Sequence, residues 1–497
     1  MGNHHSHDSK SGEQPGSGSG TSTPGGGSQK GTVPRSGSGA DLQDFQKQPP
    51  TTSLVPVEKL GKLLVQRSQK EDGVNGVTEK SFTNYLFPMY PELARQFYKY
   101  IHRIGKCKNK HIPLATFRLQ CERILAILDD KDIIETYVRM FSMDTEENAV
   151  TPDGFRSLLY TTYKLSMDHY PDGPQTCLMI NKTLSSVVNG CFNNKEAHSV
   201  GFVVRWLEEH CHRLIFPLHR YCVHVISTRH RDLETRGVGA VDGGGAGLEL
   251  ATPVLERSAW QETHGGGHAL LPASAAWLLA GAAPPLYSRP QGPPATTLAS
   301  AAWLARLVCA VPSHWVPLYA SRDHGLAANR FLYHTLAYRG PTLVVLAGDE
   351  ITVVVASSQE WRETHQYWGS AECALFQLYP AFALVERAPK MLYLNMSIRG
   401  YPRGLRAGSD PRSPVLSVAE EFDKFLFQGV PHPLRAMEVW GCGDEASRDT
   451  QLDIKRWQVR EAERQRTVKL SAADWIEHPD RYLLELAGRP QYNNSAS

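Results

Sequence analysis

The spacing of apolar residues differs between the two halves of this chain. Between residues 54 and 235 they recur every three or four positions, as in Leu93, Phe97 and Ile101, which predicts amphipathic helices. From Trp315 onward they gather in short, nearly continuous runs such as Thr342–Ala347, which predict β-strands covered on both faces. The pattern therefore predicts an α+β protein, with an all-α module followed by a two-sheet β-sandwich and flanking helices.

Turn residues divide the β half into its elements. Gly348-Asp349-Glu350 separates two apolar runs and predicts a hairpin, and Tyr379-Pro380 separates two more. The predicted strands are Trp315–Ala320, Thr342–Ala347, Ile351–Ala356, Ala374–Leu378, Ala381–Glu386, Leu392–Met396 and Ala436–Trp440. The predicted helices are Leu298–Ala310, Gly325–Ala337, Ser413–Gln428 and Arg448–Leu470.

A loose internal repeat runs through the all-α half. A β-branched residue is followed five positions later by a phenylalanine in three places: Val77 and Phe82, Ile112 and Phe117, Val150 and Phe155. In an EF-hand, such a residue at loop position eight pairs with the neighbouring loop, and an aromatic residue follows the loop. The repeat predicts three successive helix–loop–helix units of the EF-hand kind.

The calcium ligands of these units are missing. The bidentate glutamate expected at loop position twelve is replaced by Ser81, Thr116 and Gly154. The third loop, with its acidic residues at 144–147, is the one place where a weak calcium site is a minority alternative. We therefore expect structural loops without bound metal, and a plain helical bundle would have nearly the same functional consequence.

The remaining segments are poor in large apolar residues. Gly, Ser, Pro and Gln dominate the first of them, which predicts a flexible tether. The predicted organisation is a tether at 1–53, the EF-hand-like module at 54–235, a Gly/Pro-rich linker and start of the next region at 236–297, the β domain at 298–443, and a charged helix and tail at 444–497.

The first six residues, Met1-Gly2-Asn3-His4-His5-Ser6, match the acyl-acceptor pattern M-G-x-x-x-[ST]. We expect a myristoyl group on Gly2. One such chain binds membranes only marginally, and few basic residues follow it in the tether. Attachment to a membrane is therefore expected to be reversible, or to be completed by a protein partner.

Composition narrows the function classes without naming one. A formal net charge of +2 gives no whole-chain argument for nucleic-acid binding. No apolar run reaches the ~18 residues of a membrane-spanning helix, and no secretory signal is recognisable. The nine irregularly spaced cysteines favour reduced thiols in a cytoplasmic protein over a disulfide framework.

Several side chains could suggest chemistry but do not form a motif. His210, Cys211 and His212 are adjacent, so they point around a helix instead of converging on a zinc ion. Residues 264–268 read His-Gly-Gly-Gly-His, but no G-x-S-x-G nucleophile elbow follows. Asp323 and His324 fit a turn beside a helix better than a catalytic pair. We expect no catalytic residue, no metal site and no cofactor.

The β half contains a series of short motifs in a fixed order. They are His314–Tyr319, Asp323–Gly325, Arg339–Val345, Ala356–Ser358 with Trp361, Ala374–Pro380, and Met437–Gly441. In this order the motifs resemble the TLDc domain. The whole layout, with an acylation motif, an EF-hand-like region and a C-terminal TLDc-like domain, is most similar to the EAK-type, mTOR-associated TLDc proteins. The segment 404–433 departs from the family pattern, which puts any partner surface built there in doubt.

The resemblance implies a binding protein, because no catalytic residue is shared across TLDc proteins. It implies partners among the subunits of the vacuolar proton pump or the nutrient-signalling machinery, at lysosomal or endosomal membranes. The alternative is an oxidative-stress-protective protein acting through a redox thiol or an undetected enzymatic activity. Aromatic residues in loops and in the charged C-terminal helix are interface candidates, with core packing as the other explanation: Trp361, Tyr367, Trp368 and Trp457.

Overall fold

The structure is a computed structural model, and it describes residues 55–142, 149–168, 170, 173, 177–235, 252–256, 269–288 and 313–466. All described residues belong to one compact unit, which begins at Ser53. Several predictions concern residues outside these ranges, so they stay predictions: acylation of Gly2, the tether, the acidic stretch of the third loop, the 264–268 motif and the helix Leu298–Ala310.

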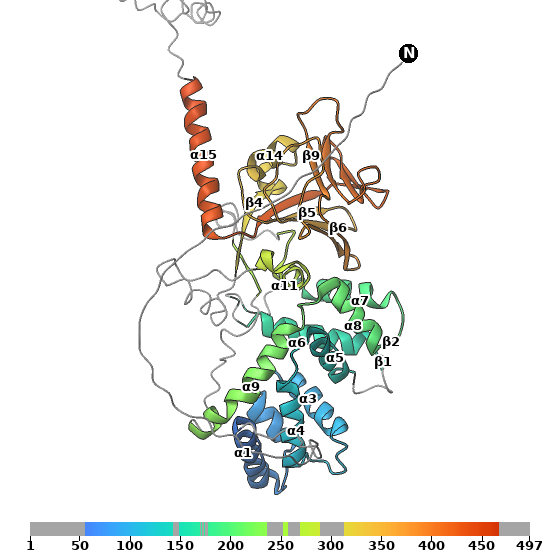
Figure 1. Ribbon diagram of the computed structural model, residues 1–497, viewed down its shortest axis with the longest axis vertical. Helices are drawn as coiled ribbons and strands as arrows, with labels where there is room; N and C mark the ends of the chain where they lie inside the picture. The colour runs from blue at the N-terminus through green and yellow to red at the C-terminus, as the bar shows by residue number, and fades with distance from the viewer. Residues whose placement is uncertain are drawn as a thin grey trace, which may run out of the picture. The chain divides into compact units, whose positions relative to one another are not determined.

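The N-terminal half is helical, as its apolar spacing predicts (Figure 1). Its hydrophobic faces meet in one core that contains Phe82, Phe117 and Phe155, all fully buried. The elements are α1 (Val55–Asp72), α2 (Glu79–Ser81), η1 (Phe82–Leu86), α3 (Pro91–Ile104), α4 (Leu114–Leu125), α5 (Asp130–Met140), α6 (Pro152–Ser166), α7 (Ile180–Phe192), α8 (Val200–Cys211) and α9 (Phe216–Thr235).

The loops between these helices pair in the EF-hand manner. Val77 forms an antiparallel bridge with Ile112, with backbone N···O distances of 2.8 and 3.0 Å. Val150, in β1 (Ala149–Val150), pairs with His198 in β2 (His198–Ser199). The third loop therefore has a partner that the sequence repeat did not reveal, because a histidine stands where the β-branched residue is expected.

The C-terminal half is built on a seven-stranded sheet with strand order β3-β4-β14-β5-β6-β7-β8. Strands β5 and β6 are buried along almost their whole length, which is the reason for their continuous apolar sequence. The bounds are β3 (Val254–Leu255), β4 (His314–Ala320), β5 (Thr342–Ala347), β6 (Thr352–Ser357), β7 (Ala374–Tyr379), β8 (Ala383–Arg387) and β14 (Ala436–Gly441).

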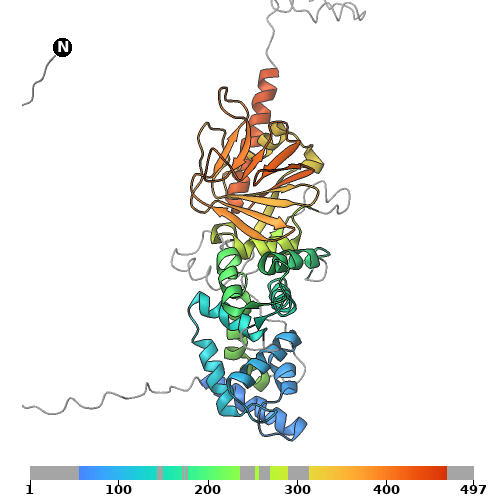
Figure 2. The same cartoon turned by 90° about the vertical axis from the view of Figure 1, so that its right-hand side faces the viewer.

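A second, five-stranded antiparallel sheet lies against the first (Figure 2). The core between the two sheets contains Leu346, Val353, Leu394 and Leu405. This confirms the predicted α+β class, with a helical region followed by a two-sheet domain. The strand order is β13-β12-β11-β10-β9, with bounds β9 (Leu392–Asn395), β10 (Gly404–Ala407), β11 (Leu416–Val418), β12 (Lys424–Phe427) and β13 (Val430–Pro433).

The helix predicted over Ser413–Gln428 is wrong, because this segment forms β11, a turn and β12. Val418 and Phe425 are opposite each other in the antiparallel register, and Phe422 occupies the turn with φ 58°. The turn places the apolar residues at intervals that imitate a helix. In β12 the burial alternates, with Phe425 and Phe427 inside and their neighbours outside, as expected of a strand with one covered face.

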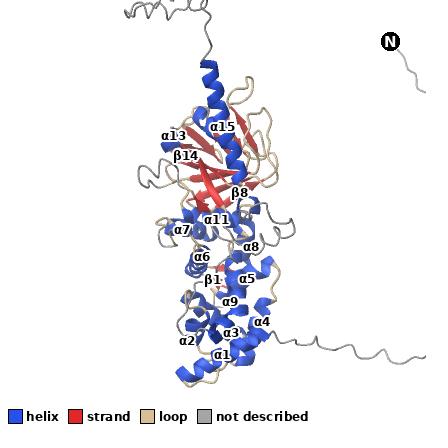
Figure 3. Ribbon diagram, turned by 90° about the vertical axis from the view of Figure 1, so that its left-hand side faces the viewer, coloured by secondary structure: helices blue, strands red, loops and turns tan. Residues whose placement is uncertain are grey.

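Further helices surround the sheets. The predicted helix Gly325–Ala337 is present as α14 (Ala328–Thr335), preceded by the short α13 (Ser321–His324), and α11 (Ala273–Ala282) precedes η2 (Pro285–Ser288). The charged C-terminal helix is α15 (Glu445–Arg466), which runs out from the sandwich (Figure 3). None of the described helices is both long enough and apolar enough to span a bilayer.

Candidate functional site

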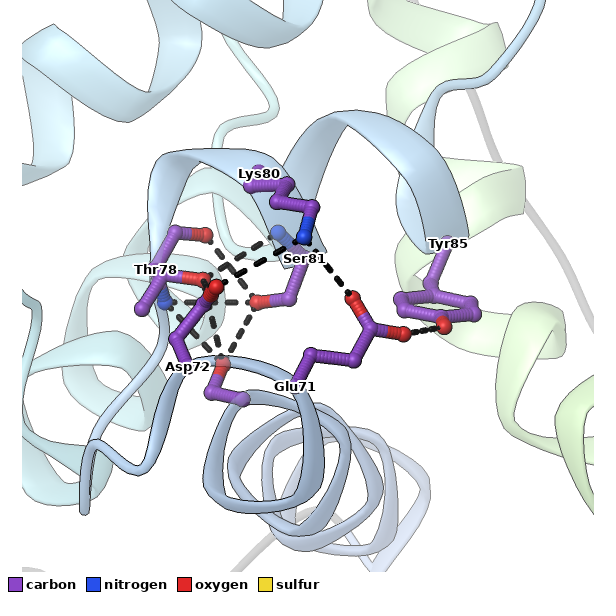
Figure 4. Close-up of polar contacts among 7 residues, drawn as sticks. Glu71, Asp72, Thr78, Lys80, Ser81 and Tyr85 are labelled. Carbon is purple, nitrogen blue, oxygen red and sulfur yellow. Dashed lines mark hydrogen bonds and ion pairs between the residues drawn. The ribbon is translucent and has the colours of Figure 1, made fainter.

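The first EF-hand-like loop, residues 70–81, holds its shape with side chains in place of a metal ion (Figure 4). Thr78 caps the following helix, accepting a hydrogen bond from the Ser81 backbone N–H at 3.2 Å. The Ser81 hydroxyl, at the position of the missing glutamate, lies 2.7 Å from the buried Ser68 hydroxyl. The Thr78 hydroxyl donates to Asp72 at 2.9 Å. These bonds close the loop without a cation.

Lys80 supplies the positive charge of this loop. Its Nζ lies 3.6 Å from an Asp72 carboxylate oxygen and 3.8 Å from one of Glu71. The Tyr85 hydroxyl donates to the other oxygen of Glu71. Because both carboxylates already contact an ammonium group or a hydroxyl, a calcium ion entering this loop would have to displace Lys80.

The second and fourth loops differ from the first in charge but also lack calcium ligands. The second loop, Gly105–Thr116, has lysines at positions two, four and six and no acidic residue. The fourth loop, aligned through His198, begins at Cys191 and ends at Phe202, which cannot donate a ligand oxygen. Among the described residues, no group of three or more His, Cys, Asp or Glu side chains is placed to hold a metal ion.

Calcium titration of the full chain by calorimetry is expected to give no saturable heat, because Lys80 occupies the first loop and the second lacks carboxylates. Thermal unfolding in calcium and in chelator should give the same midpoint, since a ligand that binds only the folded state would raise it. A saturable site would contradict this prediction. The same titration also covers the acidic stretch at 144–147.

A polar seam joins α7 to the β7–β8 turn of the large sheet. The Thr183 hydroxyl lies 3.0 Å from the Tyr379 hydroxyl and 2.8 Å from the Ser274 hydroxyl on α11, and all three are buried. The Phe382 N–H donates to the Ser186 carbonyl at 2.9 Å, and the Ser186 hydroxyl donates to the Leu378 carbonyl. These contacts give the Ala374–Pro380 motif a definite role, which is to fasten the sheet to the helical module.

Apolar contacts extend the same seam. The hydrophobic core of the helices continues onto one face of the seven-stranded sheet, where it includes Val345, Val354 and Phe376. The backbone approach is close at Gly190, where an added Cβ would lie 2.1 Å from the Phe382 carbonyl oxygen. Only glycine fits at this position without a shift of α7 or of the turn.

Glu438 fastens the segment before α11 to the central strand β14. One carboxylate oxygen accepts the Leu270 N–H at 2.9 Å, and the other accepts the Leu271 N–H at 3.3 Å and the Trp440 indole N–H at 3.0 Å. Glu438 is only 8% exposed, and burial raises its pKa although the three donors oppose that shift. Glu438, in the Met437–Gly441 motif, is therefore a buried hydrogen-bond acceptor that holds the segment before α11 on β14.

The predicted interface aromatics separate into buried and exposed residues. Trp361 and Trp368 are 2% and 4% exposed and pack edge to face in the inter-sheet core, so they are not available as a docking surface. Their loops fold inward because Trp361 donates its indole N–H to Thr342 at 2.8 Å. Tyr367 is half-buried and stacks on Tyr393. Trp457 on α15 is 59% exposed and remains an interface candidate.

The remaining candidate groups have structural partners. His210 Nδ1 accepts the Leu384 N–H at 3.1 Å, and His219 Nδ1 lies 3.2 Å from the Tyr137 hydroxyl. His324 Nδ1 accepts the Ala320 N–H at 3.1 Å, so it closes the α13 turn. Neither histidine of the 210–212 stretch converges with Cys211, which is buried.

Five buried cysteines do not resemble reactive thiols. Burial raises the pKa of Cys191 and of Cys222 to about 12, and raises those of Cys121, Cys211 and Cys442 as well. A reactive thiol needs the opposite shift, toward the thiolate at neutral pH.

The sequence is similar to one known domain family and to several known proteins. A family model, "TLDc domain", matches residues 295–443. The protein named "Restriction of telomere capping protein 5" in Leptosphaeria maculans is 23% identical over an alignment of 251 positions, and the match covers 35% of this chain and 40% of that protein. The one named "MTOR-associated protein MEAK7" in Danio rerio is 25% identical over an alignment of 178 positions, and the match covers 30% of this chain and 37% of that protein. The chain thus spans less than half the length of these relatives.

Proposed function

We propose, from the premise that residues 295–443 form a TLDc domain, that this protein is a non-enzymatic, membrane-associated adaptor. It would act on the cytoplasmic side of endolysosomal membranes, as a regulator of the vacuolar proton pump or of nutrient signalling. The relatives named as mTOR-associated support the second partner class. The match of Met1–Ser6 to the acyl-acceptor pattern supports membrane attachment through Gly2.

The seam between α7 and the β7–β8 turn is the observation that carries the adaptor function. It unites a helical module and a TLDc sandwich through buried hydrogen bonds and a continuous apolar core. Such a joint holds two different surfaces at a fixed spacing, which suits a protein that must contact a membrane-bound assembly at more than one place. His210, His219 and His324, which could be read as catalytic or metal-binding groups, form structural hydrogen bonds instead.

Gly2→Ala is expected to release the protein from membranes, because alanine does not accept the myristoyl group. Sedimentation of cell membranes, with the soluble and pelleted fractions compared for the parent and the variant, measures this effect. Asn3→Ala is a matched control that keeps Gly2 and Ser6. Equal pelleting of parent and Gly2→Ala would contradict the anchor.

Proximity labelling with the parent and with Gly2→Ala tests the partner class. Recovery of proton-pump subunits or nutrient-signalling proteins by the parent, and their loss with the variant, is the expected result. Failure to recover any lysosomal protein with either form would count against the proposed function. Cys222 and Cys442 give no support to the redox alternative, since burial raises the pKa of both thiols and so disfavours their ionised form.

A further inference from the structure

The charge of the second EF-hand-like loop is the opposite of what a calcium site needs. Between Glu92 and Glu122 the chain has no acidic residue, and this stretch carries seven lysines and arginines. Three of them, Lys106, Lys108 and Lys110, lie at alternate positions of the second loop. Their side chains are exposed, and within the described residues no ion pair involves them.

The backbone of this loop is fixed although no metal organises it. The Tyr98 hydroxyl donates to the Lys110 carbonyl at 2.8 Å, and the His102 ring Nε2 lies 2.6 Å from the Asn109 carbonyl oxygen. The Ile112 bridge to Val77 holds the end of the loop. The three lysines are therefore displayed on a rigid edge, so only their own side chains have to be ordered when they meet an anion.

A purely structural reason for basic residues here is the helix dipole, which favours cations in the last turn of α3. That accounts for Arg103, which lies within the last turn. It does not account for the three loop lysines, which follow the end of the helix at Ile104. Of the three acidic residues of the neighbouring first loop, Glu71 and Asp72 pair with Lys80. Glu79 forms no ion pair with the three lysines among the described residues.

Apolar side chains accompany the basic edge. Ile104, at the end of α3, is 38% exposed, and Leu119, one turn beyond Thr116 on α4, is 47% exposed. Exposed aliphatic residues beside lysines suit the interface of a bilayer, where aliphatic groups enter the headgroup region and ammonium groups contact phosphates. Lysine also binds phosphate as a point charge without a fixed bidentate geometry, which fits a fluid surface better than a shaped protein site.

The first described helix, α1, packs on α4, the helix that follows the second loop. An added Cβ at Gly61 of α1 would lie 2.6 Å from Leu114 at the start of α4. Val55 precedes Gly61 by six residues, a rise of ~9 Å along the helix. Gly2, the proposed acylation site, belongs to the part of the chain that precedes this point.

We propose that the lysine edge of the second loop, Lys106, Lys108 and Lys110, binds anionic lipid headgroups and is the second membrane signal of this protein. The inference rests on the proposed acylation of Gly2, because one myristoyl chain needs a second signal such as a basic patch for stable attachment. A loop that in a calcium-binding hand collects carboxylates around a cation serves here as a cationic surface.

Vesicle sedimentation of the full chain tests the proposal. The protein is made with and without an N-myristoyltransferase and mixed with vesicles of phosphatidylcholine, alone or with phosphatidylserine. Lys106→Gln, Lys108→Gln and Lys110→Gln together should weaken binding to the phosphatidylserine vesicles by about 100-fold, the equivalent of about 1 kcal/mol for each lysine. Binding to pure phosphatidylcholine should not change.

A second triple variant is the matched control. Arg399→Gln, Arg412→Gln and Lys424→Gln remove the same charge from exposed positions of the β domain that form no ion pair within the described residues. This control should keep most of the binding to phosphatidylserine vesicles. Melting temperatures equal to that of the parent establish that both triple variants fold.

The outcomes separate the two proposals. Parent-like binding by the loop variant, or an equal loss with the control, would overturn the lipid assignment. Retention of vesicle binding together with loss of an acidic protein partner would also overturn it. Equal vesicle binding by acylated and unacylated protein would refute the anchor at Gly2, whereas the difference between the two vesicle types would still report on the lysine edge.

Discussion

Replacing Glu438 with glutamine is expected to lower the free energy of unfolding by about 1–3 kcal/mol, the cost of a buried donor that loses its acceptor oxygen. Leu270, Leu271 and Trp440 all donate to its carboxylate. The amide of glutamine has the same shape but only one acceptor oxygen, so its NH₂ group would face at least one of these donors. Urea unfolding followed by tryptophan fluorescence measures the loss.

The pH dependence of this difference has a definite sign. Burial raises the pKa of Glu438 above the value of 4.5 for an exposed glutamate. An acid with a raised pKa in the folded state contributes stability at low pH that is lost as the pH rises from the unfolded to the folded pKa. The parent therefore loses stability across that window and Glu438→Gln does not. The gap between the two proteins should be largest on the acid side and smaller at neutral pH.

Glu363 provides the matched control for this substitution. Its carboxylate also accepts two backbone N–H groups, from Met396 at 2.8 Å and Ser397 at 3.1 Å, but it is only partly buried. Both N–H groups donate to the same oxygen, which the amide of glutamine also supplies, so Glu363→Gln should cost less than about 1 kcal/mol. Equal effects of the two substitutions would show that the buried hydrogen bonds of Glu438 do not stabilise the fold more than exposed ones.

Gly190→Ala is expected to destabilise the protein by about 2 kcal/mol. Alanine favours an α-helix by ~1 kcal/mol relative to glycine, but the new Cβ would lie 2.1 Å from the Phe382 carbonyl oxygen. That oxygen belongs to the backbone of a turn held by the Phe382–Ser186 hydrogen bond, so it cannot rotate away. Forcing apart such a packed contact costs ~1–3 kcal/mol and occasionally more, which outweighs the helix gain.

Gly201→Ala in α8 is the control for helix propensity. A Cβ at Gly201 would have no heavy atom within 4 Å, so this variant should be neutral or up to about 1 kcal/mol more stable. Chemical unfolding of both variants measures the contrast, and hydrogen exchange of α7 and of β7 should locate the loss at the seam. Equal stability of Gly190→Ala and Gly201→Ala would refute the close backbone approach.

The long β-strands were predictable because their burial is nearly complete. Thr342–Ala347 is a strand in the sequence prediction and in the structure, since both of its faces are covered and no polar position interrupts it. The order of the short motifs also predicted the TLDc domain, which the family model confirms. These features depend on residues that are close in sequence, where spacing alone carries the information.

Other features depend on partners that are far apart in sequence. β11 and β12 imitate a helix because Phe422 stands in the turn that joins them, and only the sheet register separates the two patterns. The pairing of Val150 with His198 spans two helices, α6 and α7, and no repeat of residue type marks it. The parallel pairing of β3 with β4 likewise joins Val254 to His314 across a long segment.

The functional surface was predictable only in part. Exposure of Trp361 and Trp368 could not be judged from their loop, because the neighbour that covers it is the other sheet. The seam at Thr183 and Tyr379 joins residues 196 positions apart, and neither belongs to a recognisable motif for such a contact. By contrast, the missing calcium ligands of the first two loops could be located from the sequence, because EF-hand ligands occupy fixed positions along it, and the absence of bound calcium stays a prediction.

The position of β14 sets the order in which the large sheet can be completed during synthesis. This strand, the last of the described strands along the sequence, lies between β4 and β5 and pairs with both. A nascent chain that has exposed only β4 to β8 therefore has a missing centre, with two open edges that would otherwise attract another strand. The seven-stranded sheet can form completely only after residue 441 has left the ribosome. A chaperone that binds the open strand edges of the β-rich half should therefore remain bound until then.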